Sequence, residues 1–524
     1  MTRHSEVRRE KVTRMDAQTL DPMADTGGSG SGSAYPRRIA VVGAGPSGLF
    51  AAQALLAQQE VPVTVDVIDR LPTPYGLLRY GVAPDHTSIK SVATALAKTF
   101  EQPGVRFLGH VEFGTDTTRE ELLASYDAVV YAVGASEDMQ LGVAGEHLPG
   151  SASAREFVAW YSGHPDARPQ SLAGVRAAAA IGVGNVAVDV ARILAKDATA
   201  LETTDMPDAV LAELHRHEVE DIWVIGRRGP HHASFTTVEL RELVSTPGVQ
   251  VTVTPDSFDG IPEDLDRRAR TNVEVLREAA AREVPDARRR LHFAFWRRPA
   301  ALEGVDEVQT LVLERTRLAA DGRVVGTGEL ERLPVQLVLR SIGYRSIPLP
   351  GVPFDERAGV VRNVEGRVVE ADGSIAPREY VVGWIKRGPV GVIGTNKSDA
   401  AQTVRHLVAD LVASGAAGSG AGAGAGAGSA AGAAAGAGAG SGAGAAAGGD
   451  TAEAGAGSSG GRADIEDVWA ARGFRATTLA DWRAIDAAEI ARGAAAGRAR
   501  TKIASWHELL ELCRGARPGG APEA

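Results

Sequence analysis

Two glycine-rich turns carry residues that could hold the pyrophosphate groups of dinucleotides. The first reads GAGPSG at residues 43–48, after the apolar run Ile39 to Val42. The second reads GVGNVA at residues 182–187, after Ala177 to Ile181. Each pattern predicts a strand, a tight turn and a helix N-terminus, whose backbone N–H groups and positive end favour phosphate. One such motif is a weak signal, but two in one chain indicate two dinucleotides and hydride transfer between them.

The first turn contains Gly43, Gly45 and Gly48, and the strand predicted after it ends beside an acid, Asp69. A carboxylate at this position accepts hydrogen bonds from a ribose diol and repels a 2′-phosphate. The first turn is therefore predicted to bind FAD or NAD rather than NADP. The alternative is that Asp69 only caps a turn at the edge of the sheet.

The second turn is followed by a strand that ends beside two cations, Arg227 and Arg228. Guanidinium groups bind phosphate through paired hydrogen bonds, so this position predicts recognition of a 2′-phosphate. Ala187 replaces the third glycine, which is a tolerated variant of the motif. The second turn is therefore predicted to bind NADP(H), unless the two arginines are only solvated surface residues.

Length and charge limit the possible functions. A chain of 524 residues can hold two or three domains. Its formal net charge of −10 disfavours a nucleic-acid partner. No apolar run approaches the roughly 20 residues of a membrane span, and the N-terminus lacks the apolar core of a signal peptide. We therefore expect a cytoplasmic protein with no membrane insertion.

The single cysteine, Cys513, excludes two kinds of redox centre within the chain. One cysteine cannot form a redox-active disulfide and cannot ligate an iron–sulfur cluster alone. Leu509, Leu510 and Leu512 surround it as a helical stripe, which predicts a partly buried residue without a chemical task. Electrons must then be carried by flavin and nicotinamide.

Four longer motifs resemble those of adrenodoxin-reductase-type ferredoxin–NADP reductases, and most closely the actinobacterial members. They read YGLLRYGVAPDH at residues 75–86, RRGP at 227–230, FTTVELREL at 235–243 and GWIKRGPVGVIGTN at 383–396. The resemblance runs from about residue 37 to 412 and returns from Asp481 to the C-terminus.

This resemblance implies an α/β, glutathione-reductase-like fold of two Rossmann-like dinucleotide-binding domains, in which the NADP domain is inserted into the FAD domain. The expected divisions are a disordered tail (1–36), a first segment of the FAD domain (37–140), the NADP domain (141–344), a second segment of the FAD domain (345–412), a flexible Gly/Ala-rich linker (413–462) and a C-terminal helical segment that docks on the FAD domain (463–524). Within the C-terminal segment the expected docking residues are Val468, Trp469, Trp482, Ile485 and Trp506.

The resemblance also implies residue roles. FAD is expected to contact Ser47, Asp69, Leu77, a strand at Val111, Trp384 and the backbone of Gly391, Val392 and Ile393. NADP is expected to contact Val183, Gly184, Asn185, Val186, Arg227, Arg228, Glu239 and Gly391. His86 and Glu242 match residues near the flavin–nicotinamide contact and are candidates for proton handling, with Asp189 as a further candidate. A helix starting near Ser398 is expected to direct its positive end toward the flavin.

Two positions depart from the family pattern. Val183 stands where a polar residue is usual, which removes one side-chain contact to NADP but leaves the backbone cradle. His231 and His232 follow the RRGP motif where other residues are usual. A pair of histidines without a third ligand is a weak metal signal, and no metal is predicted. The pair is expected to line the NADP phosphate and to bind it better when protonated.

The second substrate implied by the resemblance is a ferredoxin, an acidic iron–sulfur protein, and the reductase is expected to be a monomer. A basic face should receive such a partner. The densest basic region comprises Arg267, Arg268, Arg270, Arg288, Arg289, Arg290, Arg297 and Arg298. The alternatives are an FAD/NADPH monooxygenase, which would oxidise NADPH without ferredoxin, and an NADPH-binding electron-transfer subunit.

Overall fold

Two largely parallel sheets, each built around one glycine turn, organise the computed structural model. The structure describes residues 36–391, 393–420 and 462–515. The expected N-terminal tail, apart from Pro36, and most of the expected linker at 413–462 lie outside the described residues.

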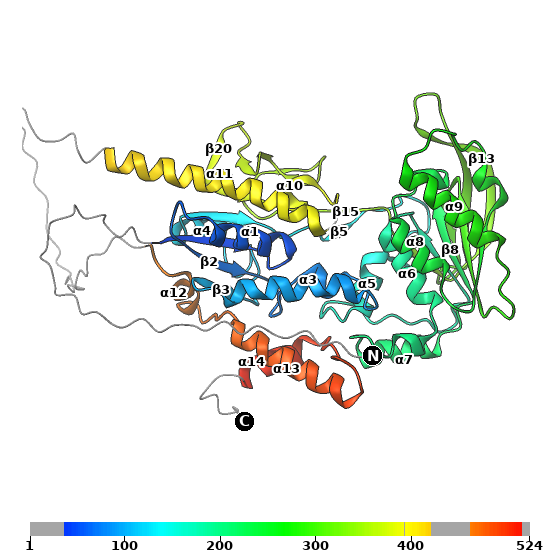
Figure 1. The fold of residues 1–524 in the computed structure, drawn as a ribbon, viewed down its shortest axis with the longest axis horizontal. Helices are drawn as coiled ribbons and strands as arrows, with labels where there is room; N and C mark the ends of the chain where they lie inside the picture. Colours follow the sequence, from blue (N-terminus) through cyan, green and yellow to red (C-terminus); the bar gives the residue numbers. More distant parts are fainter. Residues whose placement is uncertain (1–35, 392, 421–461, 516–524) are drawn as a thin grey trace, which may run out of the picture. The chain divides into compact units, whose positions relative to one another are not determined.

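The first sheet has seven strands in the order β18-β19-β20-β4-β1-β2-β3 (Figure 1). Its strands are β1 (Arg37–Val42), β2 (Val63–Ile68), β3 (Val105–Leu108), β4 (Ala128–Tyr131), β18 (Asn363–Val364), β19 (Arg367–Val369) and β20 (Ile375–Val381). The pairs β1–β2, β1–β4, β2–β3 and β4–β20 are parallel, whereas the pairs β18–β19 and β19–β20 at one edge are antiparallel. The sheet therefore combines two segments that are more than 200 residues apart in the chain.

The second sheet has six strands, all parallel, in the order β6-β14-β7-β8-β10-β9. They are β6 (Ser151–Ser153), β7 (Ala177–Ile181), β8 (Asp221–Gly226), β9 (Val249–Val253), β10 (Arg289–Phe295) and β14 (Leu337–Arg340). An antiparallel sheet of β11 (Arg297–Glu303), β12 (Thr310–Leu318) and β13 (Val324–Pro334) follows. Two short pairs complete the strands: β5 (Glu137–Asp138) with β15 (Tyr344–Arg345), and β16 (Phe354–Asp355) with β17 (Val360–Val361). The predicted α/β fold with two dinucleotide-binding sheets is confirmed.

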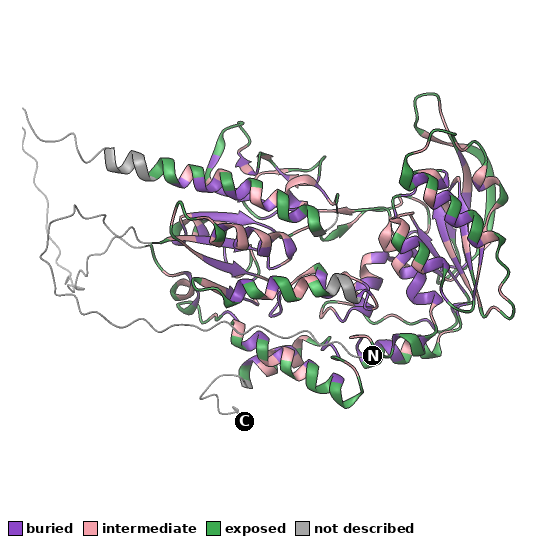
Figure 2. Ribbon diagram, in the orientation of Figure 1, coloured by how far each residue is buried: buried purple, intermediate pink, exposed green. Residues whose placement is uncertain are grey.

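Helices connect the parallel strands and cover the sheets. They are α1 (Pro46–Ala57), α2 (Leu77–Tyr80), α3 (Thr87–Ala97), α4 (Arg119–Ser125), α5 (Ala154–Tyr161), α6 (Asn185–Ala195), α7 (Asp208–Arg216), α8 (Thr237–Val244), α9 (Arg267–Ala281), α10 (Trp384–Arg387), α11 (Ile393–Gly420), α12 (Ile465–Ala470), α13 (Leu479–Ala495) and α14 (Trp506–Gly515). Figure 2 shows buried residues concentrated in the strands and on the inward faces of these helices. Each sheet thus has apolar clusters on both faces, as a parallel sheet requires.

Helix α11 differs from its prediction at both ends. It begins at Ile393 rather than Ser398, and it continues to Gly420, into the segment predicted as linker. Alanine has the highest helix propensity, and adding residues to an existing helix costs less than starting one. Ala400, Val404, Leu407 and Val408 on this helix are buried in the core that also holds α1, which lies beside it (Figure 1).

The C-terminal segment packs on the first sheet through aromatic and ionic contacts. Trp469, Trp482 and Ile485 are buried, as predicted, whereas Val468 and Trp506 are half-buried. On α13, Glu489 is fully buried and pairs with the buried Arg79. Cys513 is also buried, and its Sγ donates to the carbonyl of Leu509 one turn earlier, 3.1 Å away.

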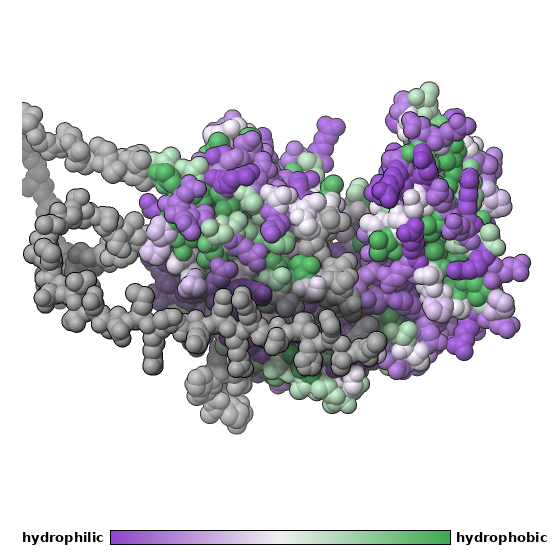
Figure 3. Space-filling view, in the orientation of Figure 1, coloured by the Kyte–Doolittle hydropathy of each residue, from purple (hydrophilic) through white to green (hydrophobic). Residues whose placement is uncertain are grey.

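Hydrophilic residues are spread over the visible surface in Figure 3. Among the described residues, every helix is too short or too polar to cross a bilayer.

Candidate functional site

The first glycine turn leaves space beside Gly45. A side chain at Gly43, whose φ is +113°, would place its Cβ 2.5 Å from the carbonyl oxygen of Ala132. A Cβ at Gly48 would lie 1.9 Å from the carbonyl oxygen of Gly43, so helix α1 packs directly on the turn. In contrast, a Cβ at Gly45 would meet nothing within 4 Å. Gly43 and Gly48 therefore serve the fold, whereas Gly45 keeps a surface open where a pyrophosphate fits.

Asp69 follows β2 and holds the first turn together. Its Oδ2 accepts from the amide of Ala44 at 2.6 Å, and its Oδ1 accepts from the amide of Leu71 at 2.9 Å. Burial raises the pKa of this carboxyl group, and the two backbone N–H groups oppose that effect. Asp69 is thus a turn cap, and the remaining lone pairs of its oxygens suit a ribose diol. Capping the turn and facing a ribose are therefore compatible roles for one side chain.

Three other residues expected at the FAD lie close to this turn. The amide of Val111 donates to the carbonyl of Asp69 at 2.9 Å. Val111 is buried but stands three residues beyond β3, so the strand expected there ends earlier. Leu77 is 42% exposed at the first residue of α2. A Cβ at Gly383 would lie 2.2 Å from the Oγ of Ser47, which places Ser47 against the turn before α10.

Trp384, the first residue of α10, has an unsatisfied donor. Its indole Nε1 is buried and has no hydrogen-bond partner among the described residues, while its ring stacks on Tyr344 with centroids 5.9 Å apart. A buried N–H without an acceptor is costly and fits a cofactor atom that would complete it. Because α11 begins at Ile393, its positive end lies beside Gly391 rather than five residues later. Val392 lies outside the described residues.

The second turn repeats this design on the six-stranded sheet. Gly182 has a φ of +133°, and a Cβ there would lie 2.1 Å from the carbonyl oxygen of Ser341. A Cβ at Gly184 would meet only the Oγ of Ser234, at 3.4 Å. The carbonyl of Val183 accepts from the amide of Ser234 at 2.9 Å, and Oδ1 of Asn185 accepts from the amide of Thr236 at 2.8 Å. The loop before α8 is thereby tied to the turn.

Val183 and Val186 take part in the cradle through the backbone, since both side chains are half-buried against the core of this sheet.

Arg227 and Arg228 are exposed directly after β8. Their backbone is fixed, because the carbonyl of Arg227 accepts from Oγ1 of Thr316 at 3.0 Å and that of Arg228 from the amide of Trp296 at 3.3 Å. Within the described residues of the chain, neither guanidinium pairs with a carboxylate. Two exposed cations without a carboxylate partner among the described residues, on a backbone held by hydrogen bonds, suit the predicted 2′-phosphate site.

His231 and His232 form an aromatic cluster with Trp296 behind these arginines. The two imidazole rings lie 4.1 Å apart, and each is 6.2 Å from the Trp296 ring. Burial and the neighbouring His232 lower the pKa of His231 to about 4, so the ring is neutral near pH 7. Its Nδ1 is buried without a partner among the described residues. Any phosphate contact at neutral pH would therefore be made by a neutral ring that donates one N–H.

The three proposed catalytic residues lie together, although they are far apart in the chain. The Nε2 of His86 is 2.9 Å from Oδ1 of Asp189 and 2.9 Å from Oε2 of Glu239. Its Nδ1 is 3.6 Å from Oε2 of Glu242. The carboxylate of Glu239 lies beside His86 and 3.4 Å from Arg192, on the first turn of α8, which packs on α6. Its expected contact with NADP stays a prediction.

Charge controls the protonation of this cluster. Burial alone would lower the pKa of His86, but hydrogen bonds to Asp189 and Glu239 outweigh it and raise the pKa to about 9. The pKa of Glu239 is lowered, because His86 offsets the cost of burial. The pKa of Asp85 is also lowered, against burial, by Arg192 and Lys196. The carboxylates thus favour the protonated form of His86, and the positive charge of Arg192 opposes it.

The same oxygen and nitrogen atoms have the spacing of a cation site. One ligand atom each from His86, Asp189 and Glu239 lies within 4.8 Å of the others. However, Nη2 of Arg192 is 2.9 Å from Oδ1 of Asp189 and 2.5 Å from Nε2 of His86. A guanidinium group thus occupies the position that a metal ion would take.

Sequence reasoning missed Asp85, Arg192 and Lys196, which complete the cluster. Arg192 and Lys196 lie three and seven residues after Asp189, on and directly after the otherwise buried helix α6. Polar residues repeated at this spacing within an apolar helix were the available signal.

The basic region divides into paired and unpaired arginines. Arg297 is buried between Asp256 and Glu331, and Arg290 and Arg298 pair with Asp221 and Glu314. Arg288 pairs with Asp197, and Arg289 donates to backbone carbonyls. The remaining three, Arg267, Arg268 and Arg270, are exposed at the start of α9, without a carboxylate partner among the described residues.

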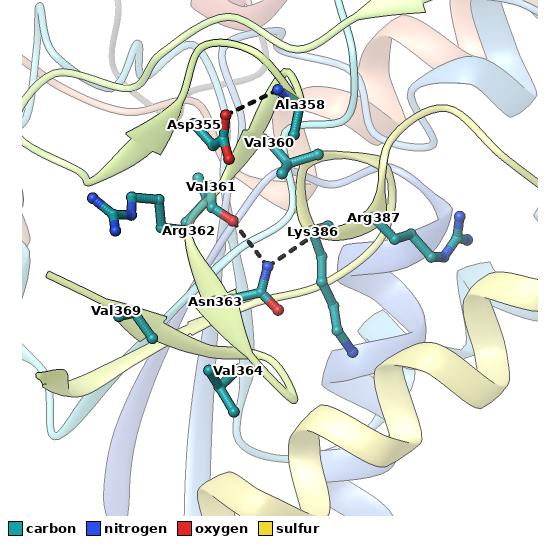
Figure 4. A pocket seen from close by; sticks show the side chains of 10 residues that line it. All are labelled: Asp355, Ala358, Val360, Val361, Arg362, Asn363, Val364, Val369, Lys386 and Arg387. Atoms are coloured by element: carbon teal, nitrogen blue, oxygen red, sulfur yellow. Dashed lines mark hydrogen bonds between the residues drawn. The ribbon is translucent and has the colours of Figure 1, made fainter. Parts of the chain in front are cut away.

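A cavity of about 560 Å³ lies between β16–β19 and α10 (Figure 4). Asn363 lies in its wall and donates to the carbonyls of Val361 and Lys386. Lys386 pairs with Asp399, and Arg387 donates to Oδ1 of Asn396. The cavity borders α10 but includes neither glycine turn.

Comparison with known proteins gives consistent results. A family model described as FAD-NAD(P)-binding matches residues 40–176. The NADPH-ferredoxin reductase FprA of Mycobacterium tuberculosis is 43% identical over 491 residues, covering 91% of this chain and 99% of that protein. Human mitochondrial NADPH:adrenodoxin oxidoreductase is 36% identical over 510 residues, covering 91% of each chain. A solved structure of M. tuberculosis FprA in complex with NADPH has a TM-score of 0.79 at 43% identity, covering 91% of this chain and all of that one.

Proposed function

Because the chain belongs to the family of NADPH-ferredoxin reductases, we propose that it is an FAD-dependent enzyme that passes electrons from NADPH to a ferredoxin. The observation that carries this proposal is the contrast between the two glycine turns. The acid Asp69 stands beside the first turn, and the unpaired cations Arg227 and Arg228 stand beside the second. This contrast supports FAD at the seven-stranded sheet and NADP(H) at the six-stranded sheet.

The residues present fit FAD. Gly45 offers an open backbone surface for the pyrophosphate, Asp69 offers acceptors for the ribose, and Trp384 has a buried N–H that needs an acceptor. Leu77, Val111, Ser47 and the backbone of Gly391 to Ile393 complete the proposed site. When bound, FAD supplies the chemistry that accepts a hydride and returns two electrons singly.

NADPH is the proposed electron donor. The turn at residues 182–187 would hold its pyrophosphate, and Arg227 and Arg228 would hold its 2′-phosphate. The overall balance is one NADPH and two oxidised ferredoxins to one NADP+, one H+ and two reduced ferredoxins. The protein's main contribution to such a reaction is to bring two rings together and to exclude water.

His86, Asp189 and Glu242 are the proposed residues for the proton in this balance. Asp189 belongs to α6, Glu242 belongs to α8, and His86 directly precedes α3. The carboxylates of Asp189 and Glu242 lie on the two nitrogens of the buried His86 ring. An imidazolium held in this way can lend a proton or orient a polar group of the nicotinamide.

The sequence suggested eight arginines as the ferredoxin-docking surface, and we now propose only the three at the start of α9. Arg267, Arg268 and Arg270 lie in its first turn, where cations oppose the helix dipole. Asp266 caps the helix and accepts from the amide of Ala269 at 2.9 Å, which offsets some of this cost. Because these exposed arginines do not stabilise the helix, we propose that they bind a partner protein. An acidic iron–sulfur partner fits that role.

The domain assignments belong to the same proposal: the FAD domain at 37–140 and 345–412, the NADP domain at 141–344, and a docked C-terminal segment at 463–524. The proposal extends to a monomeric enzyme that works in the cytoplasm, as the resemblance implies.

Anaerobic mixing of the FAD-loaded enzyme with NADPH tests the proposal. We expect flavin absorbance to bleach, and cytochrome c to be reduced only when a ferredoxin is added. Rapid NADPH oxidation in air without ferredoxin would favour a monooxygenase. Bleaching without any transfer to ferredoxin would favour an electron-transfer subunit that needs another protein.

A further inference from the structure

Arg192 is a completely buried arginine surrounded by carboxylates. Its Nε is 2.9 Å from Oδ2 of Asp85, and its Nη2 is 3.0 Å from Oδ1 of the same residue. The guanidinium also lies 2.9 Å from Asp189 and 3.4 Å from Glu239. A further carboxylate, on Glu242, is 3.7 Å away. Lys196, one helical turn after Arg192, also binds Asp85, with its Nζ 2.5 Å from Oδ2 of that residue. Arg192 and Lys196 therefore contact four acids in one cluster, of which Glu242 is the most exposed.

These groups come from three separate regions of the chain. Asp85 and His86 lie between α2 and α3, in the region that follows β2 of the seven-stranded sheet. Asp189 and Arg192 lie on α6, which begins at the second glycine turn, and Glu239 and Glu242 lie on α8. The bidentate pair between Arg192 and Asp85 thus connects the region after β2 to the helix that begins at the second glycine turn.

The ring of His86 has two kinds of partner at one nitrogen, a guanidinium group and carboxylates. Its Nε2 is 2.5 Å from Nη2 of Arg192 and 2.9 Å from Oδ1 of Asp189. A neutral ring can accept from Arg192 at Nε2, whereas a protonated ring must donate to Asp189 or Glu239. Arg192 therefore favours the neutral ring, and the carboxylates favour the protonated ring.

We propose that Arg192 is a positioning residue that fixes the ring of His86 against α6 and α8 and sets its proton affinity. The role of His86 in the reaction rests on the proposed function. The effect of Arg192 on the position and proton affinity of His86 does not. Arg192 would not touch substrate or cofactor; it acts by holding Asp85, Asp189 and Glu239 around the ring.

The sign of the effect follows from charge. With Arg192 present, Arg192 and Lys196 face Asp85, Asp189, Glu239 and Glu242, and the phenol of Tyr161 lies within electrostatic reach. Without Arg192, Lys196 would be the one lysine or arginine of the described residues left beside the four carboxylates of this cluster. Unpaired buried carboxylates are costly, so the cluster would hold a proton on His86 more tightly.

Geometry explains why an arginine serves here. The planar guanidinium can donate to Asp85 through two nitrogens while another face meets Asp189 and Glu239, whereas an ammonium offers a single point charge. Arg192→Lys should therefore keep much of the charge effect but lose the fixed orientation of the ring.

The first test measures the pKa of His86 in the FAD-loaded protein. Histidine labelled with ¹³C at Cε1 is followed by NMR across pH, and His86→Gln assigns the signal. Arg192→Met should raise the His86 pKa by at least one pH unit, and Arg192→Lys should raise it less. A pKa in folded Arg192→Met that equals the wild-type value would overturn the proposal.

The matched control is a second Arg–Asp–His trio on the surface. Arg290 donates to both oxygens of Asp221 at 2.6 Å, and Nε2 of His292 is 2.7 Å from Oδ1 of the same residue. Arg290→Met removes a bidentate pair of the same kind and should leave the His86 pKa unchanged. A His86 shift in this control as large as that in Arg192→Met would contradict a local role for Arg192.

A second variant covers the case in which Arg192→Met does not fold. Asp85→Asn releases Arg192 from the segment of His86 without leaving a buried acid unpaired. It should slow flavin reduction at saturating NADPH about tenfold, with little change in the Kd for NADPH, because the second turn is untouched. An unchanged rate would overturn the positioning role. If the wild-type flavin is not reduced by NADPH at all, the proposed function fails, while the NMR result still decides the role of Arg192.

Discussion

Nε2 of His86 lies 2.9 Å from Oδ1 of Asp189, although 103 residues separate them in the chain. The pair joins the region after α2 to the helix that begins at the second glycine turn. We expect the protonation of His86 to affect both the stability of the protein and its activity.

His86→Gln should remove a pH-dependent contribution to the stability. The folded-state pKa of His86 is raised from 6.5 to about 9, so its contribution is fully present below pH 6.5 and is lost as pH rises through 9. A shift of this size corresponds to a contribution of at most about 3 kcal/mol. The difference in apparent Tm between wild type and variant should therefore shrink between pH 6.5 and 9. A difference that grows across this range would contradict a protonated His86.

Exchange of the arginines after β8 should change the choice between NADPH and NADH. Arg227→Ala and Arg228→Ala each remove a charge-assisted contact to a 2′-phosphate, of roughly 1.5–3 kcal/mol. We expect the KM for NADPH to rise about tenfold or more per variant, with the KM for NADH nearly unchanged. Steady-state kinetics with both nucleotides measure this. Equal increases for both would place these arginines away from the 2′-phosphate.

Substitutions at two glycines of the first turn should separate cofactor binding from folding. A Cβ at Gly45 meets nothing in the protein, so Gly45→Ala should leave the stability of the FAD-free protein unchanged but weaken FAD binding. A Cβ at Gly43 would lie 2.5 Å from a backbone oxygen, so Gly43→Ala should destabilise the FAD-free protein as well. Thermal unfolding and the content of bound FAD distinguish the two. Full FAD retention in Gly45→Ala would place the pyrophosphate elsewhere.

Charge reversal at the start of α9 should weaken the interaction with ferredoxin. Arg268→Glu combined with Arg270→Glu should raise the KM for ferredoxin several-fold, and lower ionic strength should strengthen the wild-type interaction. Arg323→Glu combined with Arg332→Glu changes the net charge equally on β13 and its turn, and serves as the control. If both double variants raise the KM alike, the effect belongs to net charge and not to α9.

Local chemistry made the two turns predictable from the sequence. A glycine pattern after an apolar strand predicts a tight turn and a helix N-terminus, and both were found, whereas the sugar contacts of Asp69 and Arg227 stay predictions. The buried anchors Trp469, Trp482 and Ile485 were also predictable, because large apolar residues in a helical segment need a surface to cover.

Long-range pairing was not predictable from local patterns. The sequence indicated a docking cluster of eight arginines, but several of them pair with acids such as Asp256 and Asp221 that lie tens of residues away. The contact between Glu239 and His86 was not predictable either, because it depends on the packing of α8 on α6, whereas the assignment of Glu239 to NADP stays a prediction. The C-terminal end of α11 was misplaced because alanine favours a helix and glycine disfavours it in the segment that follows Leu411.

The most direct test of the proposed function is anaerobic rapid mixing of the FAD-loaded protein with NADPH, followed by mixing with a ferredoxin from the same organism. We expect the visible absorbance of the flavin to bleach at a rate that depends on NADPH, and to recover as two ferredoxins are reduced per flavin. Bleaching that does not occur with NADPH, or reduced flavin that ferredoxin fails to reoxidise, would contradict electron transfer from NADPH through FAD to ferredoxin.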